Sequence, residues 1–224
     1  MAFFKDKKKE ESKNSIIKKS TTLGSKISRC MVINGNIISC EAIVVDGRVN
    51  GDIISSKSVV LNRGSIVVGK IKAKEVSVEG ILEGPIEARV INIGKSAITE
   101  GYMIGENIVI AGECDGDILA KENLLIEESA NVTTLETKAK TIKVSGVLRG
   151  DVLATEFLII NKSGLVDGNI KTKEYFRSGN SKVTGTISRF VGNISNKGKN
   201  IVKNHLIKEK KEKKFKEFGR LKKI

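Results

Sequence analysis

Histidine and aromatic side chains are scarce in this chain of 224 residues. The sequence has one histidine, His205, no tryptophan, and an aromatic content of 4%. Acid-base catalysis near neutral pH most often uses histidine, and His205 lies in the Lys-rich C-terminal tail. A phosphate-binding GxxxxGK[ST] motif is also absent. The residue inventory therefore predicts no enzyme and no cofactor.

Paired cysteines and long apolar runs are missing as well. Cys30, Cys40 and Cys114 are an odd number without CxxC spacing, which predicts neither a disulfide framework nor a zinc site. No window holds about 18 uninterrupted apolar residues, and the first residues do not resemble a signal peptide. We expect a cytoplasmic protein.

The middle of the chain has no net positive charge, although the net charge of the whole chain is +14. Residues 1–29 carry nine Lys/Arg against three acids, and residues 197–224 carry twelve against three. Residues 30–196 carry 19 basic and 20 acidic side chains. A neutral body with basic ends predicts tethering to an anionic surface through the tails.

The middle of the chain repeats a Gly-x-Ile triplet every 15 to 18 residues. Arg149-Gly150-Asp151 belongs to this series, so we interpret it as a repeat and not as a receptor-binding tripeptide. Degenerate copies at Gly101-Tyr102-Met103 and Thr133-Thr134-Leu135 fill the gaps. A fixed period of this kind predicts stacked structural repeats. The other copies begin at Gly35, Gly51, Gly69, Gly84, Gly116, Gly150, Gly168 and Gly185.

Each repeat contains three short alternating segments that end in Gly, Asn or Asp, which predicts three strands and three corners. The expected fold is all-β, a triangular solenoid of about nine to ten coils of ~17 residues. A left-handed hexapeptide helix and a right-handed one both fit, although the drifting period disfavours the hexapeptide register. We expect Asp117 to point outward. One inward column is expected from Ile53, Ile71, Ile86, Met103, Ile118, Leu135, Val152, Ile170 and Ile187.

The run VVDGRVNGDIISSKSVVLNRGSIVVGKIKAKEVSVEGILEGPIEA resembles a bactofilin domain, with its recurrent G-x-V-x-G-D-I and V-x-V-x-G. The resemblance covers Met31 to Arg189 and implies a single-stranded right-handed β-helix that polymerises into cytoskeletal filaments without nucleotide. It divides the chain into a basic tail (1–29), a bactofilin-like β-helix (30–190) and a Lys-rich tail (191–224). We expect disordered or partly helical tails. The repeat region is longer than is usual for the family, and its tails are Lys-rich where bactofilin tails are often Pro-rich.

The two open ends of such a rod are the candidate functional surfaces, because unpaired strand edges must be capped or used. The first coil begins with an uncharged stretch, and the last coil gathers the rare aromatics. Those aromatics either plug the core or make an end-to-end contact, and we favour the contact. The candidate polymerisation residues are Met31, Ile33, Ile37, Tyr175, Phe176 and Phe190.

The N-terminal peptide combines two aromatic residues with four lysines, a composition typical of peptides that attach to anionic membranes. An ordinary solvated tail has the same composition. In the C-terminal tail, Phe215, Phe218 and Leu221 are spaced as in a basic amphipathic helix, although Gly219 weakens that pattern. The candidate membrane-attachment residues are Phe3, Phe4, Lys5, Lys7, Lys8 and Lys9.

The sequence therefore predicts a non-enzymatic scaffold that is a homopolymer on the inner face of the cell membrane and organises cell shape or envelope machinery. The main alternative is an oligomeric β-helical adaptor whose Lys-rich tails bind nucleic acid or acidic partners in a salt-dependent way. A weaker alternative is an inactive relative of the hexapeptide transferases. The sequence names neither the cellular process nor other protein partners.

Overall fold

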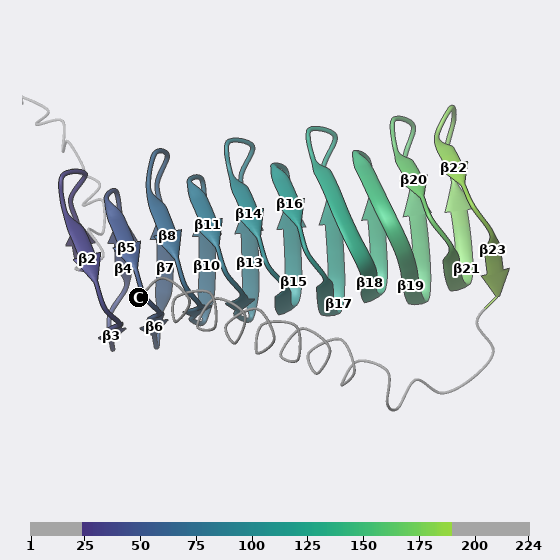
Figure 1. The fold of residues 1–224 in the computed structure, drawn as a ribbon. Coiled ribbons are helices and arrows are strands. Elements are labelled where there is room, and N and C mark those ends of the chain that lie inside the picture. Colours follow the sequence, from purple (N-terminus) through teal and green to yellow (C-terminus); the bar gives the residue numbers. More distant parts are fainter. Residues whose placement is uncertain (1–23, 190–224) are drawn as a thin grey trace, which may run out of the picture.

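The structure is a computed structural model that describes residues 24–189. Strands β1 to β23 are the only regular elements in that range, and they stack into a rod with β2 near one end and β23 at the other (Figure 1). The chain winds through about ten turns, and each turn passes three faces. Every strand pairs in parallel with the strand one turn before or after it on the same face. The prediction of an all-β solenoid is confirmed.

In the coils that are built from short strands, the longest of these strands lie on face A. Its strands begin with β1 (Ser25–Ile27), which pairs with β4. The later coils continue through the C-terminal parts of β15 (Met103–Ile110), β17 (Ile118–Ile126), β18 (Asn131–Val144), β19 (Val147–Ile160) and β21 (Ile170–Arg177). The other strands of face A are β4 (Ile43–Val45), β7 (Ser58–Leu61), β10 (Glu75–Val78) and β13 (Val90–Ile93).

Face B follows face A in every coil. After β16, this face continues through the first residues of β18 and β19 and then through the short strands β20 and β22. Its short strands are β2 (Val32–Asn34), β5 (Arg48–Asn50), β8 (Ile66–Val68), β11 (Ile81–Glu83), β14 (Ile98–Glu100), β16 (Glu113–Asp115), β20 (Leu165–Asp167) and β22 (Lys182–Thr184).

Face C closes the triangle and carries the Gly-x-Ile triplets. The long strands β15, β17, β18, β19 and β21 contribute to it before they turn onto face A. Its short strands are β3 (Ile37–Ser39), β6 (Ile53–Ser55), β9 (Ile71–Lys72), β12 (Ile86–Glu87) and β23 (Ile187–Arg189).

The core is a set of vertical columns, because alternate residues of each strand point inward and lie above their counterparts in the next coil. Face A supplies two columns, as in Ile91 and Ile93, and face B supplies one, as in Val67 and Leu82. One coil cannot enclose these side chains, whereas neighbouring coils bury them completely. The fold therefore depends on stacking.

The predicted Gly-x-Ile column exists on face C. The register pairs Ile53 with Ile71, Ile71 with Ile86, and Met103 with Ile118. Val152 pairs with Ile170, and Ile170 with Ile187. These side chains, except Ile187 at the end, are buried. The period read from the sequence is therefore the number of residues in one coil.

The placement of Leu135 in this column was wrong. Thr137 pairs with Ile118 and Val152, while Leu135 is 76% exposed. Thr134 and Leu135 together lie opposite the single residue Gly150, between two regular pairs of the register. This bulge has a physical cause: the corner glycines have positive φ, whereas no other described residue type does. With threonine at the corner, the chain takes an extra residue instead of a left-handed turn.

The outward orientation predicted for Asp117 was also wrong. Its side chain is buried, and Asp117 Oδ1 accepts hydrogen bonds from the backbone N–H groups of Leu135 and Glu136, each at 3.1 Å. Thr134 Oγ1 also donates to Asp117 Oδ1, at 3.3 Å. The carboxylate thus satisfies the backbone donors that the bulge releases from the ladder.

Candidate functional site

The N-terminal end of the rod is formed by β1, β2 and β3, whose outer edges pair with no strand of the described residues. Ile33 and Ile37 are half-buried and pack against the core, and both belong to inward columns. Val32 is 60% exposed and Ile38 is 78% exposed on the outside of the same coil. Met31 is exposed in the turn before β2. At this end, backbone groups that no strand of residues 24–189 pairs with lie beside apolar side chains.

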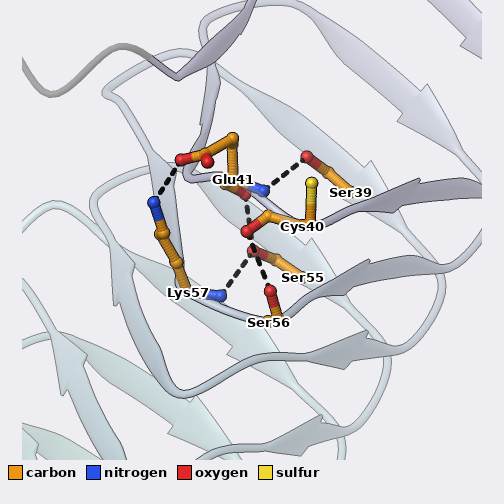
Figure 2. Close-up of polar contacts among 6 residues, drawn as sticks. All are labelled: Ser39, Cys40, Glu41, Ser55, Ser56 and Lys57. Carbon is orange, nitrogen blue, oxygen red and sulfur yellow. Dashed lines mark hydrogen bonds and ion pairs between the residues drawn. The ribbon is translucent and has the colours of Figure 1, made fainter.

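Side-chain hydrogen bonds tie the first coil to the second at the corner between faces C and A (Figure 2). Ser55 Oγ donates to the Glu41 carbonyl and Ser56 Oγ donates to the Cys40 carbonyl, both at 2.8 Å. Lys57 forms an ion pair with Glu41. These contacts hold the terminal coil in the register of the rod, so its outer edge is presented as a strand edge.

A second ion pair anchors β1. Lys26 Nζ lies 2.8 Å from Asp46 Oδ2 in the next coil. The hydrogen bond from Lys26, followed by one from Asn62, lowers the pKa of the Asp46 carboxyl below its usual range. Ser25–Ile27 thus belong to the first coil.

The C-terminal end is built differently. Tyr175 lies above Leu158 in an inward column and is half-buried against the core. Phe176 points to the outside of face A, is 54% exposed, and stacks on Phe157 with ring centroids 6.5 Å apart. The two neighbouring aromatic residues therefore have different positions: Tyr175 covers the core, whereas Phe176 extends the outer surface of the last coil.

Arg177 is an end residue that the sequence reasoning missed. It pairs with Ile160, so it occupies the last position of a column that is apolar in every earlier coil. Arg177 Nε donates to Ser181 Oγ at 3.0 Å, and its guanidinium also donates to the Ser181 carbonyl. Counting one period beyond Ile160 finds this position. A charged side chain there ends the apolar column.

Several predicted residues lie outside the described range. Phe190 follows the last described residue, and the membrane-attachment residues Phe3, Phe4, Lys5, Lys7, Lys8 and Lys9 precede the first. Their roles stay predictions. The structure brings Ile33 and Ile37 together at one end of the rod and Tyr175 and Phe176 at the other.

Chemical sites of other kinds are not found among residues 24–189. This part of the chain has no group of three or more metal-ligating side chains suited to an ion. Cys114 lies in the inward column of face B, and burial raises the pKa of its thiol to about 12. Cys30 and Cys40 are exposed on the first coil. Within the same residues, the structure has no helix that is long and apolar enough to span a bilayer.

Comparison with known proteins agrees with this geometry. A family model described as Bactofilin, polymer-forming cytoskeletal, matches residues 25–110 and, in an overlapping stretch, residues 92–188. No curated protein and no solved structure matches the chain. The two matched stretches together span nearly the whole solenoid, from β1 to β23. The chain belongs to the Bactofilin family of polymer-forming cytoskeletal proteins.

Proposed function

We propose that this protein is a non-enzymatic scaffold whose rods join end to end, without nucleotide, into filaments on the inner face of the cell membrane. The observation that carries the proposal is the unpaired outer edge that the described strands leave at each end of the rod. At each end the last strands lack a partner among the described residues, and apolar side chains lie beside the free edges. Such edges favour pairing with another chain. The family match supports self-association.

The proposed contact residues fall into two groups. Ile33, Ile37 and Tyr175 lie at the ends of inward columns, to which the structure adds Ile187, which is 45% exposed. Met31 and Phe176 lie on the outer rim of the end coils, where we expect Phe190 to join them. A joined rod would continue the columns across the junction and surround them with the rim.

Sedimentation and electron microscopy without added nucleotide test this proposal. Ile37→Arg and Ile187→Arg each place a charge at an end column and are expected to give soluble, β-rich subunits. Phe176→Arg is expected to weaken assembly less. Ile54→Arg is the matched control, because Ile54 is 40% exposed on the outside of the second coil. Filaments of Ile37→Arg and Ile187→Arg like those of wild type would rule out the end-to-end contact.

Thiol labelling gives a second measurement on the same filaments. Cys30 and Cys40 on the first coil are expected to react more slowly with a maleimide in the filament than in Ile187→Arg subunits. Buried Cys114 is the internal reference and should stay unreactive in both. Equal labelling rates at Cys30 and Cys40 would place the junction away from the N-terminal coil.

The membrane part of the proposal rests on residues 1–9. Each Lys near an anionic leaflet contributes about 1 kcal/mol, and a filament repeats the peptide many times. Changing Phe3 and Phe4 to Ser is expected to abolish co-flotation with anionic liposomes while filaments still form. Unchanged flotation would contradict this assignment. If the wild-type protein does not float with liposomes but binds nucleic acid in a salt-sensitive way, the adaptor alternative is supported.

A further inference from the structure

Face B carries two exposed rows of side chains along the middle coils, in β8, β11, β14 and β16. One row is Ile66, Ile81, Ile98 and then Glu113, as the register of these strands requires. The parallel row, two residues further along each strand, is Val68, Glu83, Glu100 and Asp115. We call these eight side chains the acidic-apolar face. Ile81 is 37% exposed and Ile98 is 48% exposed, whereas Ile66 and Val68 are half-buried.

The four carboxylates of this face form no ion pair or side-chain hydrogen bond with another residue of the range 24–189. Some acids elsewhere on the rod do form ion pairs: Glu87 contacts Lys70 at 2.6 Å, and Glu122 contacts Lys140 at 2.7 Å. Stacked coils place like charges about 4.8 Å apart, which is unfavourable without a cation nearby.

Acidic side chains outnumber basic ones over the whole middle third of the rod. Residues 75–136 carry 13 acids against three basic side chains, while residues 24–74 carry three acids against eight. Residues 137–189 carry four acids against ten basic side chains. This charge repels an anionic membrane or nucleic acid and favours a basic partner.

We propose that the C-terminal segment 208–224 of the same chain docks on the acidic-apolar face. This segment has nine Lys/Arg and three acids, and Phe215, Phe218 and Leu221 are interleaved with them. The apolar residues recur at intervals of three, which in a helix is a rise of about 4.5 Å, close to the ~4.8 Å between coils. The aromatic and leucine side chains cover the isoleucine row while the lysines face the carboxylate row.

The length of the connecting chain permits this contact. The last strand, β23, ends at Arg189, and 18 residues separate it from position 208. Eighteen extended residues span at most about 60 Å. On face B, β14 lies five coils from β22, which is about 24 Å. An attached segment within reach has an effective concentration in the millimolar range, so weak individual contacts suffice.

Zero-length carbodiimide cross-linking of the full-length protein at low salt tests the contact directly. Lysines of the segment are expected to cross-link to Glu83, Glu100, Glu113 and Asp115. A mixture of protein labelled with ¹⁴N and with ¹⁵N should give these cross-links within one isotopic species. Cross-links between species would overturn docking on the same chain in favour of a neighbouring copy.

Charge reversal supplies the second readout. Glu83→Lys with Glu100→Lys is expected to raise the rate of tryptic cleavage after Arg220 about fivefold. Adding Lys213→Glu and Lys214→Glu to that variant should restore slow cleavage. The control is Glu106→Lys with Glu156→Lys, which makes the same charge change at the corner between faces C and A. Equal cleavage rates in wild type, face variant and control, with filaments intact, would overturn the proposal.

Discussion

Equivalent positions in the middle of the rod and at its ends can carry the same residue type but differ in what surrounds them. Ile118 and Ile187 occupy the same column, yet Ile118 is fully buried whereas Ile187 is 45% exposed. Among the described residues, a middle coil pairs with a coil on both sides, whereas an end coil pairs on one side. An identical substitution should therefore report mainly on folding in the middle and on assembly at the end.

The largest difference is expected for a charge placed in the Gly-x-Ile column. Ile118→Asp buries a carboxylate between Met103 and Thr137 and should cost about 4 kcal/mol or more, enough to unfold adjacent coils. Ile187→Asp leaves its carboxylate in contact with water and should cost less than about 1 kcal/mol. Urea denaturation followed by circular dichroism measures both. Equal losses of stability would mean that the last coil is as enclosed as the middle.

A smaller difference is expected at the corner glycines. Gly35 and Gly116 have similar positive φ values of 142° and 146°, so alanine strains the backbone at both. A Cβ at Gly116 would lie 2.2 Å from the Gly101 carbonyl oxygen, whereas one at Gly35 meets nothing within 4 Å. Gly116→Ala should therefore destabilise the protein by about 2 kcal/mol more than Gly35→Ala. The midpoints of urea unfolding of the two variants measure this difference in stability, and equal midpoints would contradict the prediction.

The buried carboxylate at the bulge gives the next effect. Asp117→Ser removes the acceptor for two backbone N–H groups and should cost about 1–3 kcal/mol. Asp151 is exposed and accepts from the Asn169 N–H at 3.0 Å, so Asp151→Ser should cost less than about 1 kcal/mol. Thermal unfolding of both variants tests this pair. A silent Asp117→Ser would show that water replaces the carboxylate.

The smallest effect has the opposite sign. Thr137 Oγ1 is buried and has no hydrogen-bond partner among residues 24–189, whereas Thr172 Oγ1 donates to the Glu174 carbonyl at 2.8 Å. Thr137→Val should stabilise the protein by about 1 kcal/mol, because it removes an unsatisfied hydroxyl at nearly constant volume. Thr172→Val loses a hydrogen bond and should not stabilise. Loss of stability in Thr137→Val would indicate that the hydroxyl has a partner.

The sequence predicts the middle of the rod better than its irregularities. The recurring period makes each Gly-x-Ile copy evidence for the next, so the column through Ile53 and Ile118 follows from spacing alone. The degenerate copy at residues 133–135 is different. Without a glycine at the corner, the backbone either adopts a strained left-handed conformation or takes in an extra residue, and the spacing does not decide between the two. Asp117 was misplaced for the same reason: alternation predicts an outward side chain, but the bulge offers it free N–H donors.

The end surfaces are less predictable because, within residues 24–189, each end coil has a neighbouring coil on one side only. Counting periods places Ile33, Ile37 and Tyr175 in inward columns, and the same counting finds Arg177. Counting periods does not predict which coil is the last one. The total charge of the chain does not reveal the carboxylates of face B that lack an ion pair among residues 24–189. The partner of each side chain lies in the neighbouring coil, 15 to 18 positions away in the sequence.

The stacking of coils also determines how the rod responds to tension. The hydrogen bonds between parallel strands join each coil to the next, as in the bonds from Gly101 N to Asp115 O and from Gly116 N to Thr133 O. They therefore run along the rod axis, and a pull on the ends stretches them along their length. Boundaries between coils bear the load in series, so each carries the full force. A rod of this kind breaks at its weakest boundary, and a filament built from it is no stronger than the junction between two subunits.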